Sequence, residues 1–65
     1  MNWDQIQGQW KQLAGRAQTE WGELTNDDVD QVAGDRLRLE GKIQERYGKN
    51  KEEAREAVDA WIARL

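Results

Sequence analysis

The segment LAGRAQTEWG at residues 13–22 recurs 26 residues later as LEGKIQERYG at residues 39–48. The same shift superposes two glycine triplets, each spaced by seven residues: Gly8, Gly15 and Gly22 on Gly34, Gly41 and Gly48. So many matched or similar positions at a single offset indicate an internal duplication. We therefore predict one domain over residues 1–65, with repeat halves at about 3–33 and 34–65.

Outside the glycines, the pattern is helical throughout. In the first third of the chain, large apolar residues and one alanine recur three or four positions apart: Trp3, Ile6, Trp10, Leu13, Ala17 and Trp21. This spacing places them on one face of a helix. It predicts one long first helix, and leaves open whether Gly15 breaks it.

Three polar residues are each followed, three positions later, by a side chain that can complete a capping box. These pairs are Asn2 with Gln5, Thr25 with Asp28, and Asn50 with Glu53. They predict helix starts at these points, and Gly34 and Gly48 predict helix ends. The expected inward faces are Val29, Val32 and Ala33, then Leu39, Ile43 and Tyr47, then Ala54, Ala57, Val58, Trp61, Ile62 and Leu65.

No segment alternates apolar and polar residues, so no strand is expected. Each half is predicted to contain a longer helix, a tight turn and a capped helix, and two such hairpins must cover each other's apolar faces. The predicted fold is a small all-α bundle of two helical hairpins packed at a large angle.

Gly8, Gly15 and Gly41 need an explanation, because glycine inside a helix costs about 1 kcal/mol relative to alanine. They lie opposite the apolar stripe of their helices. We consider three interpretations: a second helix crosses closely at these positions, the helix breaks there (at Gly15 above all), or the bare backbone is exposed to a partner.

Composition excludes several kinds of site. The chain has no cysteine and no histidine, so zinc sites of thiolate and imidazole are excluded. It has no nucleophile elbow, phosphate loop or dinucleotide fingerprint. No stretch of about 18 apolar residues is present that could cross a bilayer. We predict a cytoplasmic protein that is not an enzyme, with no catalytic residue, cofactor or metal.

Charge is divided unevenly along the chain. Residues 1–35 carry seven acidic and two basic side chains, whereas residues 36–65 carry six acidic and eight basic ones. Either the two halves attract each other within one fold, or they form an acidic docking face or a head-to-tail contact between copies. The candidate interaction surface comprises Glu20, Glu23, Asp27, Asp28, Asp30, Arg16 and Lys42.

Three other kinds of site have simpler structural explanations. Arg16 and Lys42 follow glycines and could meet phosphate, but the net charge of −3 disfavours nucleic acid. The acidic groups Asp27–Asp30 and Glu52–Glu56 could hold a cation, but acidic residues at helix starts are explained by capping. The tryptophan stripe could enter a membrane interface or a partner groove, but its spacing favours a core.

Several segments resemble the CsbD-like family of small bacterial proteins. They are Glu20-Trp21-Gly22-x-Leu24-Thr25-x-Asp27-Asp28, the run from Leu39 to Gly48, and Lys51-Glu52-x-Ala54. The resemblance implies a domain of two roughly orthogonal helical hairpins, similar to the SAM-domain-like class. It also implies an association with general stress responses, and no established activity, ligand or catalytic residue.

Together, these observations predict a non-enzymatic stress-response protein that acts through contacts with an unknown protein or with itself. One alternative is a hydrophilic protectant of proteins or membranes under osmotic or drying stress, which the mean hydropathy of −1.11 suits. Another is a weak nucleic-acid-binding module.

Overall fold

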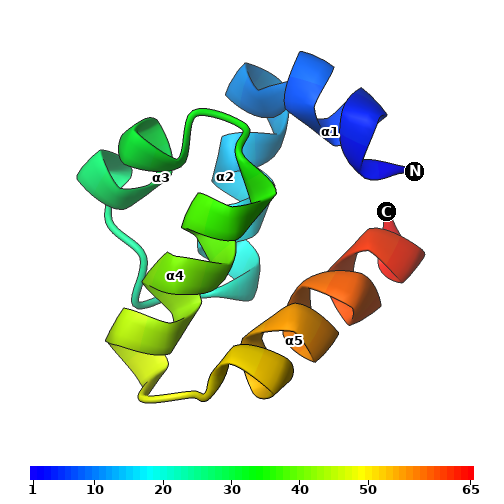
Figure 1. The fold of residues 1–65 in the computed structure, drawn as a ribbon. Coiled ribbons are helices and arrows are strands. Elements are labelled where there is room, and N and C mark those ends of the chain that lie inside the picture. The colour runs from blue at the N-terminus through cyan, green and yellow to red at the C-terminus, as the bar shows by residue number, and fades with distance from the viewer.

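A computed structural model describes all residues from Met1 to Leu65 and contains five α-helices and no strand (Figure 1). The helices are α1 (Trp3–Gly8), α2 (Trp10–Glu20), α3 (Asn26–Val32), α4 (Arg36–Tyr47) and α5 (Lys51–Arg64). The prediction of an all-α chain is confirmed. The radius of gyration of 10.5 Å is close to the roughly 10.7 Å expected for a compact chain of this length.

The three predicted capping boxes are all present. The side chain of Asn2 accepts the amide of Gln5, and the Gln5 side chain accepts the amide of Asn2 in return. The same reciprocal bonds begin α3 at Thr25 and Asp28, and α5 at Asn50 and Glu53. Each box satisfies two backbone donors that a helix start leaves unpaired, which is why these helices begin where the sequence predicts.

The first helix breaks, but not at Gly15. It stops at Gly8, and Gln9, which has φ −116° and ψ 24°, separates α1 from α2. The bend lets two indoles reach one end of α3: Nε1 of Trp3 donates to the carbonyl of Gly34, and Nε1 of Trp10 to that of Val29, both at 2.9 Å. The prediction of one long helix is wrong because these bonds to a distant segment favour the bend.

The end of α3 also differs from the prediction. Ala33, expected to face inward, is exposed and adopts the left-handed conformation with φ 49°, and Gly34 follows with φ 82°. Gly34 is buried against Gln7, whose Cγ would lie 3.2 Å from a Cβ placed on the glycine. The chain thus turns sharply beneath α1, and only a glycine combines this φ with so close a neighbour.

One core joins all five helices. Its 13 buried apolar residues are Ile6, Trp10, Leu13, Ala17, Trp21, Leu24, Val29, Val32, Leu39, Ile43, Ala54, Val58 and Trp61. Trp21 packs edge-on against Trp61 with ring centroids 5.2 Å apart. The prediction that the tryptophan stripe forms core is confirmed for Trp10 and Trp21, and Trp3 is half-buried. Trp61 of α5 is buried with them.

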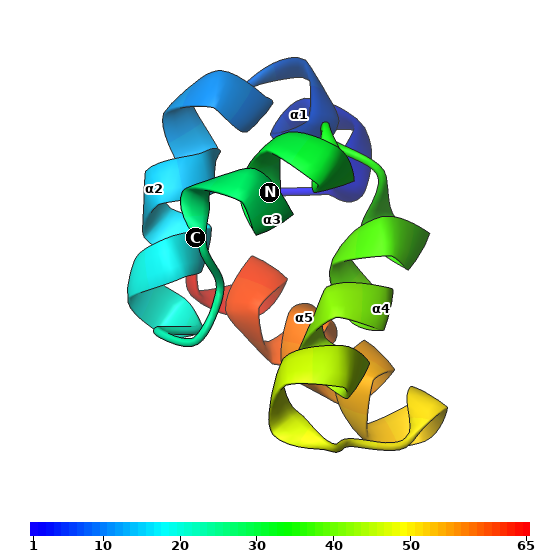
Figure 2. The ribbon, with the colours of Figure 1, turned by 90° about the vertical axis from the view of Figure 1, so that its left-hand side faces the viewer.

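The arrangement of the helices leaves two long outer faces. Figure 2 shows α2 and α4 on opposite sides of the molecule, with α3 and α5 between them. Helix α4 packs against both α3 and α5. The outer faces of α2 and α4 therefore remain uncovered, and each carries a glycine at its middle, Gly15 and Gly41.

Candidate interaction surface

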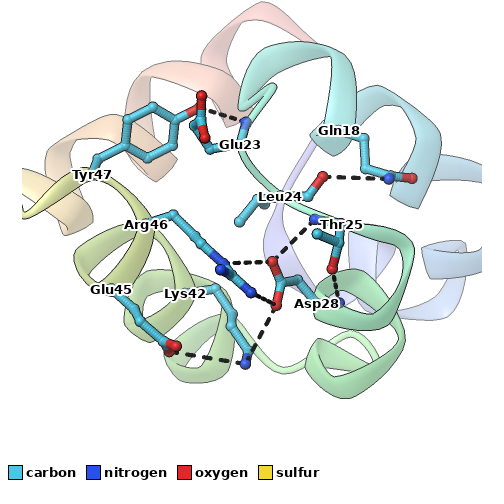
Figure 3. Close-up of polar contacts among 9 residues, drawn as sticks. All are labelled: Gln18, Glu23, Leu24, Thr25, Asp28, Lys42, Glu45, Arg46 and Tyr47. Atoms are coloured by element: carbon cyan, nitrogen blue, oxygen red, sulfur yellow. Dashed lines mark hydrogen bonds and ion pairs between the residues drawn. The ribbon is translucent and has the colours of Figure 1, made fainter.

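Asp28 is the most highly connected of the predicted surface residues, and it is not on the surface. Its residue exposure is 2%. The Arg46 guanidinium holds both carboxylate oxygens, with Nε 2.9 Å from Oδ2 and Nη2 2.9 Å from Oδ1 (Figure 3). Lys42 Nζ lies 3.6 Å from Oδ1, and the Thr25 amide donates to Oδ2 at 3.0 Å. Asp28 thus both caps α3 and ties it to α4.

These donors lower the pKa of the Asp28 carboxyl. The hydrogen bonds from Arg46, above all, and from the Thr25 amide hold the pKa of Asp28 well below its usual range. The same pair raises the pKa of Arg46. The carboxylate therefore stays ionised at every physiological pH, and Arg46 faces a charged partner throughout that range.

A second ion pair joins the first half of the chain to the second, between the end of α2 and the end of α5. Glu20, at the end of α2, pairs with Arg64 in the last turn of α5. Together with the Asp28 contacts, it links acidic side chains of the first half to basic side chains of the second. The first interpretation of the charge division, attraction within one fold, is confirmed for Glu20, Asp28 and Lys42.

The remaining predicted surface residues are exposed and lie apart. Arg16 is on the outer face of α2, and Glu23, Asp27 and Asp30 follow α2 or lie on α3. None of these four side chains forms an ion pair. The structure therefore divides the seven predicted residues into three that hold the fold together and four that face solvent.

Tyr47 is exposed, contrary to the prediction that it continues the buried stripe of Leu39 and Ile43. Its hydroxyl accepts the backbone amide of Glu23 at 3.0 Å. The ring instead covers the turn after α2, because the chain leaves the core at the end of α4. The phenol satisfies a loop amide that would otherwise bond only to water.

A charge network that the sequence did not indicate joins the buried Glu40 of α4, through Arg36, to the exposed Asp59 of α5. The Arg36 guanidinium donates to Glu40 at 2.8 Å and to Asp59 at 2.6 Å. Glu40 is 5% exposed, so Arg36 supplies the partner that this carboxylate needs. The i,i+4 spacing of Arg36 and Glu40 was a visible signal, but nothing in the sequence marks Glu40 as buried.

An open groove of about 610 Å³ runs between the end of α3 and the outer side of α4. Its lining residues are Asp30, Gln31, Ala33, Arg38, Gly41, Lys42 and Glu45. Leu37, one helical turn before Gly41, is 71% exposed. Two of the predicted residues, Asp30 and Lys42, thus meet at this groove.

The surroundings of Gly8, Gly15 and Gly41 decide between the three interpretations of these glycines in part. A Cβ added to Gly8, Gly15 or Gly41 would meet nothing within 4 Å, so no helix of this chain crosses there and that interpretation is wrong. The break at Gly15 is also wrong, because α2 continues through it. The chain breaks its helix at Gly8 instead, where α1 ends. For Gly15 and Gly41, exposure of the backbone to a partner is the prediction that stays.

The alternative sites lack the geometry they need. Three of the four indoles are buried in the core and cannot stack on bases, and Lys42 lies against Asp28. No three acidic side chains converge where a metal ion would be held. No helix has the length and apolar character required to cross a bilayer.

The fold and surface define a class: small all-helical proteins with one apolar core, internal charge bridges and solvent-exposed outer helix faces. The sequence pattern of the CsbD-like family matches residues 4–56, so this chain belongs to that family. It is 51% identical to a UPF0337 protein of Pectobacterium atrosepticum over 94% of this chain and 88% of the other. It is 48% identical to the UPF0337 protein YjbJ of an Escherichia coli strain, over 98% and 93%.

A UPF0337 protein of Bordetella pertussis is 50% identical, over 98% of this chain and 97% of the other. No solved structure matches the chain. The relatives are similar along nearly their full length, and their names state no activity, ligand or partner.

Proposed function

We propose that this CsbD-like protein is a cytoplasmic, non-enzymatic protein of the general stress response that acts through protein contacts. The stress association is supported by the family resemblance. The contact function is supported by one observation above all: Leu37 is 71% exposed beside an open groove on the outer face of α4. A partner that packs on this face would remove Leu37 from water, and apolar side chains are enriched at the buried centre of protein interfaces.

The predicted surface residues have different roles in this proposal. Glu23, Asp27 and Asp30 are exposed carboxylates that could steer a partner toward the α3 side of the groove. Arg16 would act separately, on the outer face of α2. Glu20, Asp28 and Lys42 would support the surface from within, because their ion pairs hold α2, α3, α4 and α5 in place.

The internal duplication is part of the same proposal. Shifted by 26 residues, α2 falls on α4, and α3 falls within α5. The two outer faces then correspond, with Gly15 matching Gly41. This correspondence supports an origin of the two predicted hairpins from one repeated unit, whose two copies now differ in that Lys11 stands where the other has Leu37.

Site-specific photo-crosslinking in living cells tests the contact function. A photoreactive amino acid is placed at Leu37 in the full chain, and the matched control carries it at Thr19 on the outer face of α2. Under osmotic stress, position 37 should give a discrete adduct that mass spectrometry identifies, and position 19 should not. Absence of any adduct at position 37, with and without stress, would contradict the proposal.

A further inference from the structure

We propose that the outer face of α4 is a two-fold self-association surface, on which α4 of a second copy of this chain crosses antiparallel at Gly41. The inference rests on the contact function proposed above and names its partner. Three observations support it: a Cβ placed on Gly41 would meet no neighbour, Leu37 is exposed, and the charged residues follow a particular order along the same face of α4.

The glycine supplies the point of closest approach. Gly41 lies in the middle of α4, and a Cβ there would meet nothing within 4 Å. Its cost of about 1 kcal/mol relative to alanine is not offset by any packing inside the chain. The distance between two packed helices depends on the side chains at their crossing point, so a glycine there lets a second helix approach closely.

Leu37 supplies the apolar contact. It lies one turn before Gly41, and Glu45 lies one turn after it, so all three share one helix face. In an antiparallel crossing centred on Gly41, Leu37 lies along the methylene groups of the partner's Glu45. A two-fold axis repeats this contact, so both exposed leucines are covered at once.

The charged side chains on this face can pair with those on the same face of a second copy. Asp30 and Glu45 are acidic, and Arg38 and Lys42 are basic, so the groove is neutral although the chain carries −3. Arg38 is three residues before Gly41 and Glu45 four residues after it. An antiparallel crossing therefore places each Arg38 beside the partner's Glu45, in two equivalent ion pairs.

The outer face of α2 shows why the second copy is expected at α4. Gly15 is equally bare, but the residues that correspond to Leu37, Arg38, Lys42 and Glu45 are Lys11, Gln12, Arg16 and Thr19. That face has two basic side chains, no acidic one and no leucine. Two copies would repel each other there, so Gly15 serves as a matched control for Gly41.

Sedimentation velocity of the full chain, from low micromolar to millimolar concentration, tests the self-association. The mass should rise with concentration from 7.6 kDa toward twice that value. Gly41→Ala should shift the association to higher concentration, because a methyl group separates the helices, whereas Gly15→Ala should leave it unchanged. A monomer at every concentration, or equal effects of the two alanines, would overturn the proposal.

A charge exchange tests the antiparallel geometry. Arg38→Glu and Glu45→Arg, each alone, should be monomeric, since both ion pairs become repulsive. An equal mixture of the two variants should recover the dimer, because the mixed dimer has one pair as in the wild type and one pair with its charges exchanged, and both attract. Thermal unfolding of each variant confirms that it folds, since Arg38 also donates to the Gln31 carbonyl at 3.2 Å.

Failure of the mixture to associate would overturn the proposed crossing. The contact function is tested separately by crosslinking at position 37. A protein that stays monomeric but crosslinks from Leu37 to a different, identified protein would overturn the self-association and leave the contact function standing.

Discussion

Arg46 and Asp28 form a bidentate ion pair in which two nitrogen–oxygen distances are each 2.9 Å. The pair joins α4 to the first turn of α3, and so joins the basic half of the chain to the acidic half. Since the same carboxylate also accepts the Thr25 amide, the local cap and the tertiary contact share one side chain. A change at Asp28 therefore affects both the start of α3 and its attachment to α4.

Asp28→Asn is expected to lower the free energy of unfolding at neutral pH, because it removes the charge that Arg46 and Lys42 face. The pKa of Asp28 is depressed in the folded state, so its contribution is complete above the unfolded value of about 3.9 and is lost as the pH falls below it. Thermal unfolding of wild type and variant from neutral pH to pH 2 measures the difference.

The difference between wild type and Asp28→Asn should therefore be largest near neutral pH and shrink in acid. Asp27→Asn is the matched control, since the Asp27 carboxylate is next to Asp28 in the chain but is exposed and forms no ion pair. A difference in stability that stays constant across this pH range would contradict the assignment of Asp28 as an ionised partner of Arg46.

Gly15→Ala and Gly41→Ala should each stabilise the monomer by about 1 kcal/mol, because neither methyl group meets a neighbour and alanine is the better helix former. In a domain of this size, that corresponds to a rise in melting temperature of about 4–8 °C. Circular dichroism at low micromolar concentration measures the change. Unchanged or lower melting temperatures would show that these helix faces are not open.

Gly34→Ala should have the opposite effect. Its φ of 82° lies in the left-handed region, and the added methyl group would lie 3.2 Å from Cγ of Gln7. The backbone strain alone costs roughly 1–2 kcal/mol. The same melting experiment, run beside Gly15→Ala, should show a lower transition, and a stabilised variant would contradict the observed turn.

Trp10→Phe should destabilise the protein by about 1–3 kcal/mol, because the buried bond from the indole to the Val29 carbonyl is lost. Trp3→Phe should cost less, since Trp3 is only half-buried and its bond to Gly34 is nearer to solvent. Urea unfolding followed by far-ultraviolet circular dichroism compares the two. Equal effects would argue against the bend at Gln9 as a means of placing Trp10.

Arg36→Met should reduce stability by about 1–3 kcal/mol, because it leaves the buried Glu40 carboxylate without its partner. Arg55→Met is the control, since Arg55 and Glu52 form an exposed pair within one helix and such pairs contribute little. Urea midpoints of both variants provide the measurement. A larger effect at Arg55 would contradict the role given to the Arg36 network.

Much of the fold could be predicted because the information is local. Asn2, Thr25 and Asn50 each bond to an amide three residues away, so no other element is needed to define those helix starts. The spacing of apolar residues likewise predicted the buried positions from Ile6 to Trp61. The candidate site was predicted less well, because whether a carboxylate is paired depends on a segment elsewhere in the chain.

By itself, the sequence determined the helical class, three helix starts and most of the core, since these follow from contacts within one or two turns. Only the tertiary structure decided the bend at Gln9, the exposure of Ala33 and Tyr47, and the pairing of Asp28 with Arg46 and of Glu20 with Arg64. Each of these depends on how two elements distant in sequence are placed. The physical reason is that periodicity shows which face of a helix is apolar, whereas packing selects which neighbour covers it.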